Sequence, residues 1–85
     1  MTDKKKHLGY NIKRIREILG IKQSSFAHQM NISQQAVSYI ENKACLNDET
    51  LVKVSEVLKV PVQSIKSFDD NKLLDVLFEL PEKEN

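Results

Sequence analysis

Residues 23–42 constrain the fold more than any other part of the chain, because they read as two short helices joined by a tight turn. The first of these helices covers residues 23–30, and Ala27 is small enough to let the second approach it closely. Asn31 can adopt the left-handed conformation that ends a helix. Ser33 is a favoured N-cap for the second helix. We therefore expect two helices that cross at a steep angle.

Three further helices are predicted by apolar residues that recur three or four positions apart. Their inward residues are, in chain order, Leu8, Ile12, Ile15, Ile18 and Leu19; Leu51, Val54 and Leu58; and Val62, Ile65 and Phe68. Gly20 suits the end of the first of these helices. Asn47 or Asp48 suits the cap of the second, and Pro61 the first turn of the third. The chain has no strand-length alternating run, so an all-α fold is expected.

The helix that follows Ser33 has two contrasting faces. Val37 and Ile40 lie three positions apart and are expected to point inward. The opposite face is polar and comprises Gln34, Gln35 and Ser38. No acidic residue occurs among residues 33–40, so this face suits an anionic groove, where a glutamine can bond adenine through two atoms. The alternative is an ordinary solvated helix face.

The size of the chain and its single cysteine narrow the class of protein. Eighty-five residues make one small domain. Cys45 cannot form an internal disulfide, which favours a reducing cytoplasm, and we expect it to be a half-buried filler. No apolar run approaches the length of a membrane span, and no signal peptide is recognisable.

Charge is distributed unevenly along the chain although the net charge is only +1. Residues 1–22 carry +5, residues 23–46 carry 0 and residues 47–85 carry −4. We expect residues 1–7 to form a flexible basic arm, and the basic N-terminal part to be the one that meets phosphates. A chance segregation of charge is the alternative.

Neither catalysis nor metal binding is indicated. The two histidines and one cysteine show no metal-ligand spacing. His7 lies in the arm without an evident partner, and His28 is expected on the surface. The serines lack a histidine and an acid at a catalytic spacing, and no glycine-rich phosphate loop is present. We therefore expect no enzyme activity, no cofactor and no small-molecule ligand.

Four short motifs together resemble the Xre family, the lambda repressor and Cro type of helix-turn-helix proteins. They are IKRIRE at 12–17, GIKQ at 20–23, FA at 26–27 and VSYIEN at 37–42. The resemblance extends over about residues 12–68. It implies a five-helix lambda-repressor-like domain over residues 8–68, with a helix-turn-helix motif at residues 23–42.

The resemblance also implies roles for individual residues on the DNA. Gln34 and Gln35 match the base-reading pair, with Ser38 one turn further on. Gln23 matches a glutamine that touches a phosphate and braces Gln34. The remaining phosphate contacts would come from Tyr39, Asn42 and Lys43. Tyr39 as a packing residue only is the alternative.

Arg16 and Glu41 match a buried ion pair between the first and third helices of family members. Such a pair fixes orientation more than it adds stability, because desolvation offsets the attraction. The sequence departs from the family at Lys22, where a capping Ser or Thr is usual. Asn31 replaces a common glycine, and Lys43 stands where glycine often follows Asn42, which affects the loop geometry there.

The C-terminal segment and tail, residues 69–85, leave several interpretations open. Asp69 or Asp70 suits the cap of a segment at residues 73–80 that Pro81 ends. Its apolar residues are Leu73, Leu74, Val76, Leu77, Phe78 and Leu80. They could seal the five-helix core, form a dimer seam or bind another protein.

Two functions follow from these observations. The first is a sequence-specific transcriptional regulator, a repressor that binds a palindromic operator as a homodimer. The alternative is an antitoxin or a subunit of a larger regulator, which would engage a partner protein through the C-terminal segment.

Overall fold

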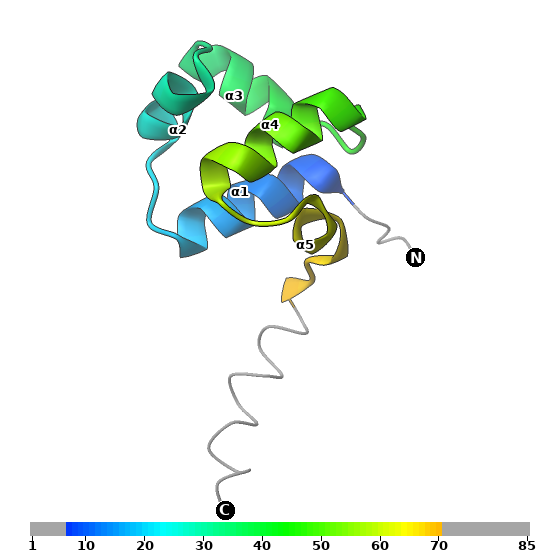
Figure 1. Ribbon diagram of the computed structural model, residues 1–85. Coiled ribbons are helices and arrows are strands. Elements are labelled where there is room, and N and C mark those ends of the chain that lie inside the picture. The colour runs from blue at the N-terminus through cyan, green and yellow to red at the C-terminus, as the bar shows by residue number, and fades with distance from the viewer. Residues whose placement is uncertain (1–6, 71–85) are drawn as a thin grey trace, which may run out of the picture.

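The computed structural model describes residues 7–70, and these residues form five helices (Figure 1). The helices are α1 (Leu8–Ile18), α2 (Gln23–Met30), α3 (Gln34–Glu41), α4 (Asp48–Leu58) and α5 (Val62–Ser67). The predicted all-α fold is confirmed, with no strand between residues 7 and 70. None of these helices is long and apolar enough to cross a bilayer. The segment predicted at residues 73–80 and the arm residues 1–6 lie outside the described residues.

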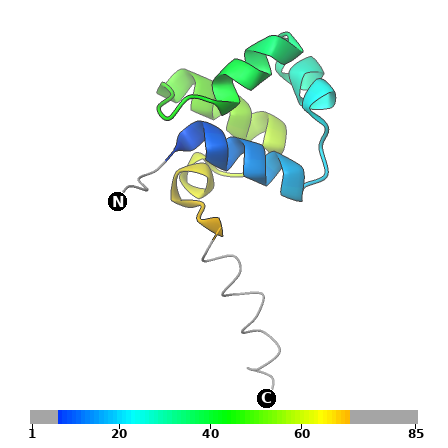
Figure 2. The same cartoon turned by 180° about the vertical axis from the view of Figure 1, so that it is seen from behind.

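The core is assembled from all five helices. Helix α3 packs against α1 and α2, α4 packs against α2 and α5, and α5 packs against α1. The view from behind shows α1 crossing in front of α4, with α3 above it and α5 below it (Figure 2). The buried apolar side chains are Ile12, Ile15, Phe26, Ala27, Met30, Val37, Leu51, Val54, Leu58 and Ile65. Their removal from water is the main force that holds α3 on the rest of the domain.

The predicted apolar stripe of α1 is correct only as far as Ile15. Ile18 and Leu19 are 49% and 47% exposed, so the prediction that they point inward is wrong. The helix ends at Ile18, and its last turn extends past α5 toward the loop that leads into α2 (Figure 1). Gly20 then takes a left-handed conformation, with φ of 74°, in the turn after the helix.

Two helix starts differ from their predictions. His7 is not an unpartnered arm residue, because its Nδ1 accepts a hydrogen bond of 3.0 Å from the Tyr10 amide and caps α1. Pro61 is the N-cap of α5 and stands just before its first turn. Asn47 caps α4, as one of the two predicted alternatives, by accepting from the Thr50 amide at 2.9 Å.

Polar contacts tie α1 to the segment that contains α5. The Asn11 side chain is buried and donates to the Ile65 carbonyl at 2.9 Å. The Tyr10 hydroxyl donates to Asp70 at 2.5 Å, and Arg14 Nε lies 3.3 Å from the same carboxylate. The hydrogen bond to Asp70 raises the pKa of Tyr10 above its ordinary value, because the carboxylate stabilises the protonated phenol.

Candidate functional site

The α2–α3 turn has the geometry that the sequence predicts. Asn31 is left-handed, with φ of 63°, and its amide donates to the His28 carbonyl at 3.0 Å. The Ile32 amide donates to the Ala27 carbonyl at 3.0 Å, which closes the end of α2. Ser33 then caps α3 by accepting from the Ala36 amide at 3.0 Å. The turn thus redirects the chain within three residues, Asn31 to Ser33, and fixes the start of α3.

One face of α3 is exposed and polar, and the other is buried. Gln34 and Gln35 are exposed at its N-terminal end, and Ser38 is half-buried one turn later. Val37 is fully buried, and Ile40 is half-buried against the core. The three polar residues therefore share the outward side of a helix whose inward side is held in the core.

The amide of Gln23 connects the polar face of α3 to the start of α2. Its Nε2 lies 3.2 Å from Ser38 Oγ and 3.2 Å from Glu41 Oε1, and donates to both. Its Oε1 accepts from Gln34 Nε2 at 3.2 Å. Gln23 is therefore held by three residues of α3, and it braces Gln34 through a direct hydrogen bond.

Beneath this amide lies a buried ion pair between α1 and α3. Arg16 Nε lies 2.7 Å from Glu41 Oε2, and Arg16 Nη2 lies 3.3 Å from Glu41 Oε1. The two side chains are only 8% and 3% exposed. Arg16 Nη1 donates to the Ile21 carbonyl at 2.8 Å, so the pair also fixes the α1–α2 loop. Charge and hydrogen-bonding capacity are thus both matched inside the protein.

The C-terminal end of α3 presents an aromatic ring and a cation. Tyr39 is 66% exposed, so it is not partly buried as the alternative of a packing residue expected. Lys43 Nζ lies 3.3 Å from the Tyr39 hydroxyl and 5.0 Å from the centre of the ring. Asn42 is exposed, and its Nδ2 donates to the Ser38 carbonyl at 2.8 Å. Lys43 and Asn42 therefore extend the polar surface of α3 past its last turn.

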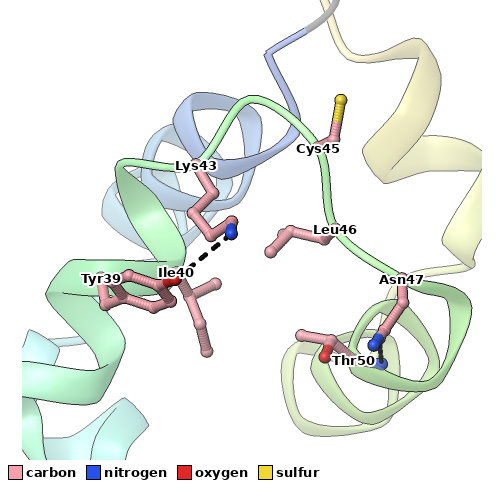
Figure 3. Close-up of a pocket in the computed structure, with 7 residues that line it drawn as sticks. All are labelled: Tyr39, Ile40, Lys43, Cys45, Leu46, Asn47 and Thr50. Carbon is pink, nitrogen blue, oxygen red and sulfur yellow. Dashed lines mark hydrogen bonds between the residues drawn. The ribbon is translucent and has the colours of Figure 1, made fainter.

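A shallow hollow separates this end of α3 from α4 (Figure 3). Its volume is about 210 Å³, and its lining residues are Tyr39, Ile40, Lys43, Cys45, Leu46, Asn47 and Thr50. Figure 3 shows Leu46 pointing into the hollow and the Cys45 thiol pointing away from it. Cys45 is exposed, so the prediction that it is a half-buried filler is wrong. The loop leaves α3 with its backbone turned toward α1, and the thiol is left facing solvent.

The N-terminus of α1 is docked on the loop that carries Lys43, a feature that the sequence analysis missed. The Leu8 amide donates to the Ala44 carbonyl and the Gly9 amide to the Lys43 carbonyl, each at 2.9 Å. These amides have no partner within α1, so the loop satisfies them. A Cβ on Gly9 would lie 2.4 Å from the Ile40 carbonyl oxygen and 2.6 Å from that of Lys43. Only glycine allows this contact.

The charges around α2 and α4 are unequal. Lys22 is exposed and stands at the N-cap of α2, where its side chain makes no capping hydrogen bond. The first turn of α2 contains no acid, whereas Asp48 and Glu49 occupy the first turn of α4. The N-terminus of α2 is therefore the better of the two for an anion. His28 is exposed, as predicted, and no three metal-ligating side chains gather between residues 7 and 70.

Comparison with known proteins places this geometry in a family. A family model described as helix-turn-helix, of the Cro/C1 type, matches residues 12–65. The match covers α2, the turn and α3 together with most of α1, all of α4 and the first four residues of α5. Among curated proteins, none matches the chain.

Proposed function

The chain belongs to the Cro/C1-type helix-turn-helix family of DNA-binding regulators, and we propose that it is a repressor that reads a palindromic operator as a homodimer. In this proposal α3 enters the major groove of double-stranded DNA. Two copies of α3 would lie ~34 Å apart and enter successive turns of the major groove on one side of the duplex. Occupation of an operator by such a dimer blocks access of other proteins to the same DNA.

The observation that carries the proposal is the exposed, acid-free glutamine pair at the start of α3. Gln34 and Gln35 are the first two residues of α3 and are exposed. The left-handed turn at Asn31 and the Ser33 cap hold this N-terminal end of α3 in place. A glutamine amide offers one acceptor and two donors, which matches the major-groove edge of adenine. Ser38 accepts from Gln23, so its hydroxyl hydrogen is available for an acceptor on a base.

Phosphate contacts are proposed on both sides of the glutamine pair. Both Nε2 hydrogens of Gln23 are used within the protein, so its phosphate contact would come from its backbone N–H at the start of α2. Beyond α3, Lys43, Asn42 and the exposed hydroxyl of Tyr39 would meet the backbone of the same groove. These contacts set the register of the protein on DNA, and the glutamines set the sequence.

Alanine variants separate the two kinds of contact. We expect Gln34→Ala and Gln35→Ala each to lose ~1–3 kcal/mol of binding free energy and to relax base preference at one or two base pairs. Lys43→Ala is expected to weaken binding to all sequences alike and to lower the salt dependence by about one phosphate contact. Fluorescence anisotropy with matched and mismatched duplexes at several salt concentrations measures both effects.

Gln63→Ala is the matched control, because Gln63 is an exposed glutamine on α5. Its affinity and base preference are expected to equal those of the wild type. The assignment of Gln34 to a base would be contradicted if Gln34→Ala weakened binding to every duplex by the same factor. The assignment of Lys43 to a phosphate would be contradicted if Lys43→Ala altered the preferred base.

A further inference from the structure

The amide of Gln23 can take only one orientation, and a residue in the core decides which. Glu41 is an acceptor only, since a carboxylate has no hydrogen to donate. Its Oε1 lies 3.2 Å from the Gln23 amide, so the amide group that faces it must be the NH₂. The second hydrogen of this NH₂ goes to Ser38 Oγ. A flipped amide would instead place the Gln23 oxygen against the negatively charged Glu41 Oε1, and this repulsion between two acceptors disfavours it.

Arg16 holds Glu41 in this position. Two of its nitrogens contact the two oxygens of the carboxylate, and a third is bound to the Ile21 carbonyl. A guanidinium has only donors, so Glu41 meets Arg16 as an acceptor at both oxygens. The orientation of Gln23 is therefore set by an ion pair that is almost wholly buried.

The orientation of the Gln23 amide determines which hydrogen-bonding groups of Gln34 are free. With its NH₂ turned inward, Gln23 presents its Oε1 to α3 and accepts from Gln34 Nε2. One of the two amide hydrogens of Gln34 is thereby used within the protein. What remains for DNA is one N–H donor and the Oε1 acceptor.

The one free N–H donor and the Oε1 acceptor of Gln34 can distinguish adenine from guanine. Adenine shows one acceptor, N7, and one donor, the N6 amino group, in the major groove, whereas guanine shows two acceptors, N7 and O6. One free N–H and one oxygen satisfy adenine, but they leave the guanine O6 facing an oxygen. From this chain of hydrogen bonds we propose that Glu41, held by Arg16, is a positioning residue that makes Gln34 select adenine over guanine without itself touching DNA. The proposal rests on the proposed function, because it needs Gln34 in the major groove.

The test compares adenine with guanine at a single base pair. The position is the one at which Gln34→Ala removes the preference of the wild type, within a site selected from random duplexes. The first variant is Arg16→Met with Glu41→Gln, which keeps the shape of the pair but lets residue 41 accept or donate. The second is Gln23→Met, which leaves the ion pair in place. Gln63→Ala is the control, since Gln63 is an exposed glutamine on α5 and lies outside this chain of hydrogen bonds. Circular dichroism at the binding temperature confirms that each variant is folded.

We expect the wild type to prefer adenine by roughly tenfold or more at this position. In Arg16→Met/Glu41→Gln and in Gln23→Met the preference is expected to fall to about threefold or less, because Gln34 can then offer both hydrogens to guanine. Gln63→Ala should keep the wild-type ratio there. A merely structural role of the ion pair would lower affinity for both duplexes and leave the ratio unchanged.

Three results would overturn the proposal. The first is a guanine preference of the wild type at the Gln34 position. The second is an unchanged ratio in Gln23→Met, the variant that leaves the core intact. The third is a loss of the adenine preference in Gln23→Met while a folded Arg16→Met/Glu41→Gln keeps it. That result would mean that Gln23 positions Gln34 without any contribution from the ion pair. Failure of the proposed function is a separate outcome, in which no site is enriched from random DNA at all.

Discussion

Arg16→Met is expected to lower the free energy of unfolding by about 3–5 kcal/mol, the cost of removing one partner from a buried ion pair. Methionine fills much of the space of the aliphatic stem, but the Glu41 side chain, which is only 3% exposed, would lose the cation that compensates its burial. The Gln23 amide would be its remaining donor among the contacts of this site. The Ile21 carbonyl would also lose its partner. Urea unfolding followed by circular dichroism measures the loss.

Two further variants make this result specific. Arg16→Met combined with Glu41→Leu is expected to recover most of the stability, because neither charge is then buried. Arg14→Met is the matched control on the same helix: Arg14 is 32% exposed, its two acidic partners Glu17 and Asp70 are 41% and 30% exposed, and each such pair contributes ~0–1 kcal/mol. If Arg16→Met cost no more than Arg14→Met, the ion pair would have no structural role.

Gly9→Ala is expected to destabilise the domain by about 2 kcal/mol or more and to lower Tm by roughly 10 °C. The added Cβ would lie within 2.7 Å of three backbone atoms in Ile40, Glu41 and Lys43. Backbone cannot rotate away as a flexible side chain can, so α1 and the end of α3 must separate. Thermal unfolding of the variant and the wild type measures the effect.

The sign of the Gly9→Ala effect is diagnostic. In an exposed helix position the same substitution would stabilise by up to about 1 kcal/mol through helix propensity. Lys13→Ala, at an exposed position of α1, is the control and is expected to change stability by less than about 0.5 kcal/mol. A more stable Gly9→Ala would contradict the close contact between α1 and the loop after α3.

Most of the fold was predictable from local patterns. Apolar spacing marked all five helices, and the turn residues Asn31, Ser33 and Asn47 take the conformations that their side chains favour. These predictions succeeded because caps and left-handed turns depend on a few neighbouring residues. The inward positions of Val37 and Ile65 followed from helical periodicity in the same way.

The incorrect predictions concern residues whose surroundings depend on segments far away in the sequence. Ile18 and Leu19 continue the apolar spacing of α1, but no periodicity tells where a helix runs past its neighbours. No local pattern explains the glycine at position 9, because the carbonyl groups that leave no room for a side chain there lie more than thirty positions away in the sequence. His7 is a cap only because α1 begins at Leu8. Cys45 faces solvent because of the path of its loop.

The sequence indicated the contacts among the candidate site residues only in part. The resemblance to the Xre family indicated Gln23, Gln34, Arg16 and Glu41 as separate pairs. The structure joins them into one chain of hydrogen bonds from the core to the surface of α3. Which end of an amide faces which neighbour depends on three helices at once, and no spacing in the sequence encodes it.

The central claim is that α3 reads a specific DNA sequence, and selection of binding sites from random duplex DNA tests it most directly. The wild type is expected to enrich an inverted repeat whose half-site centres lie about 10 base pairs apart. The variant with Gln34→Ala and Gln35→Ala is expected to lose this motif while it keeps weak, salt-sensitive binding. Failure of the wild type to enrich any sequence, or enrichment of the same motif by both proteins, would contradict the claim.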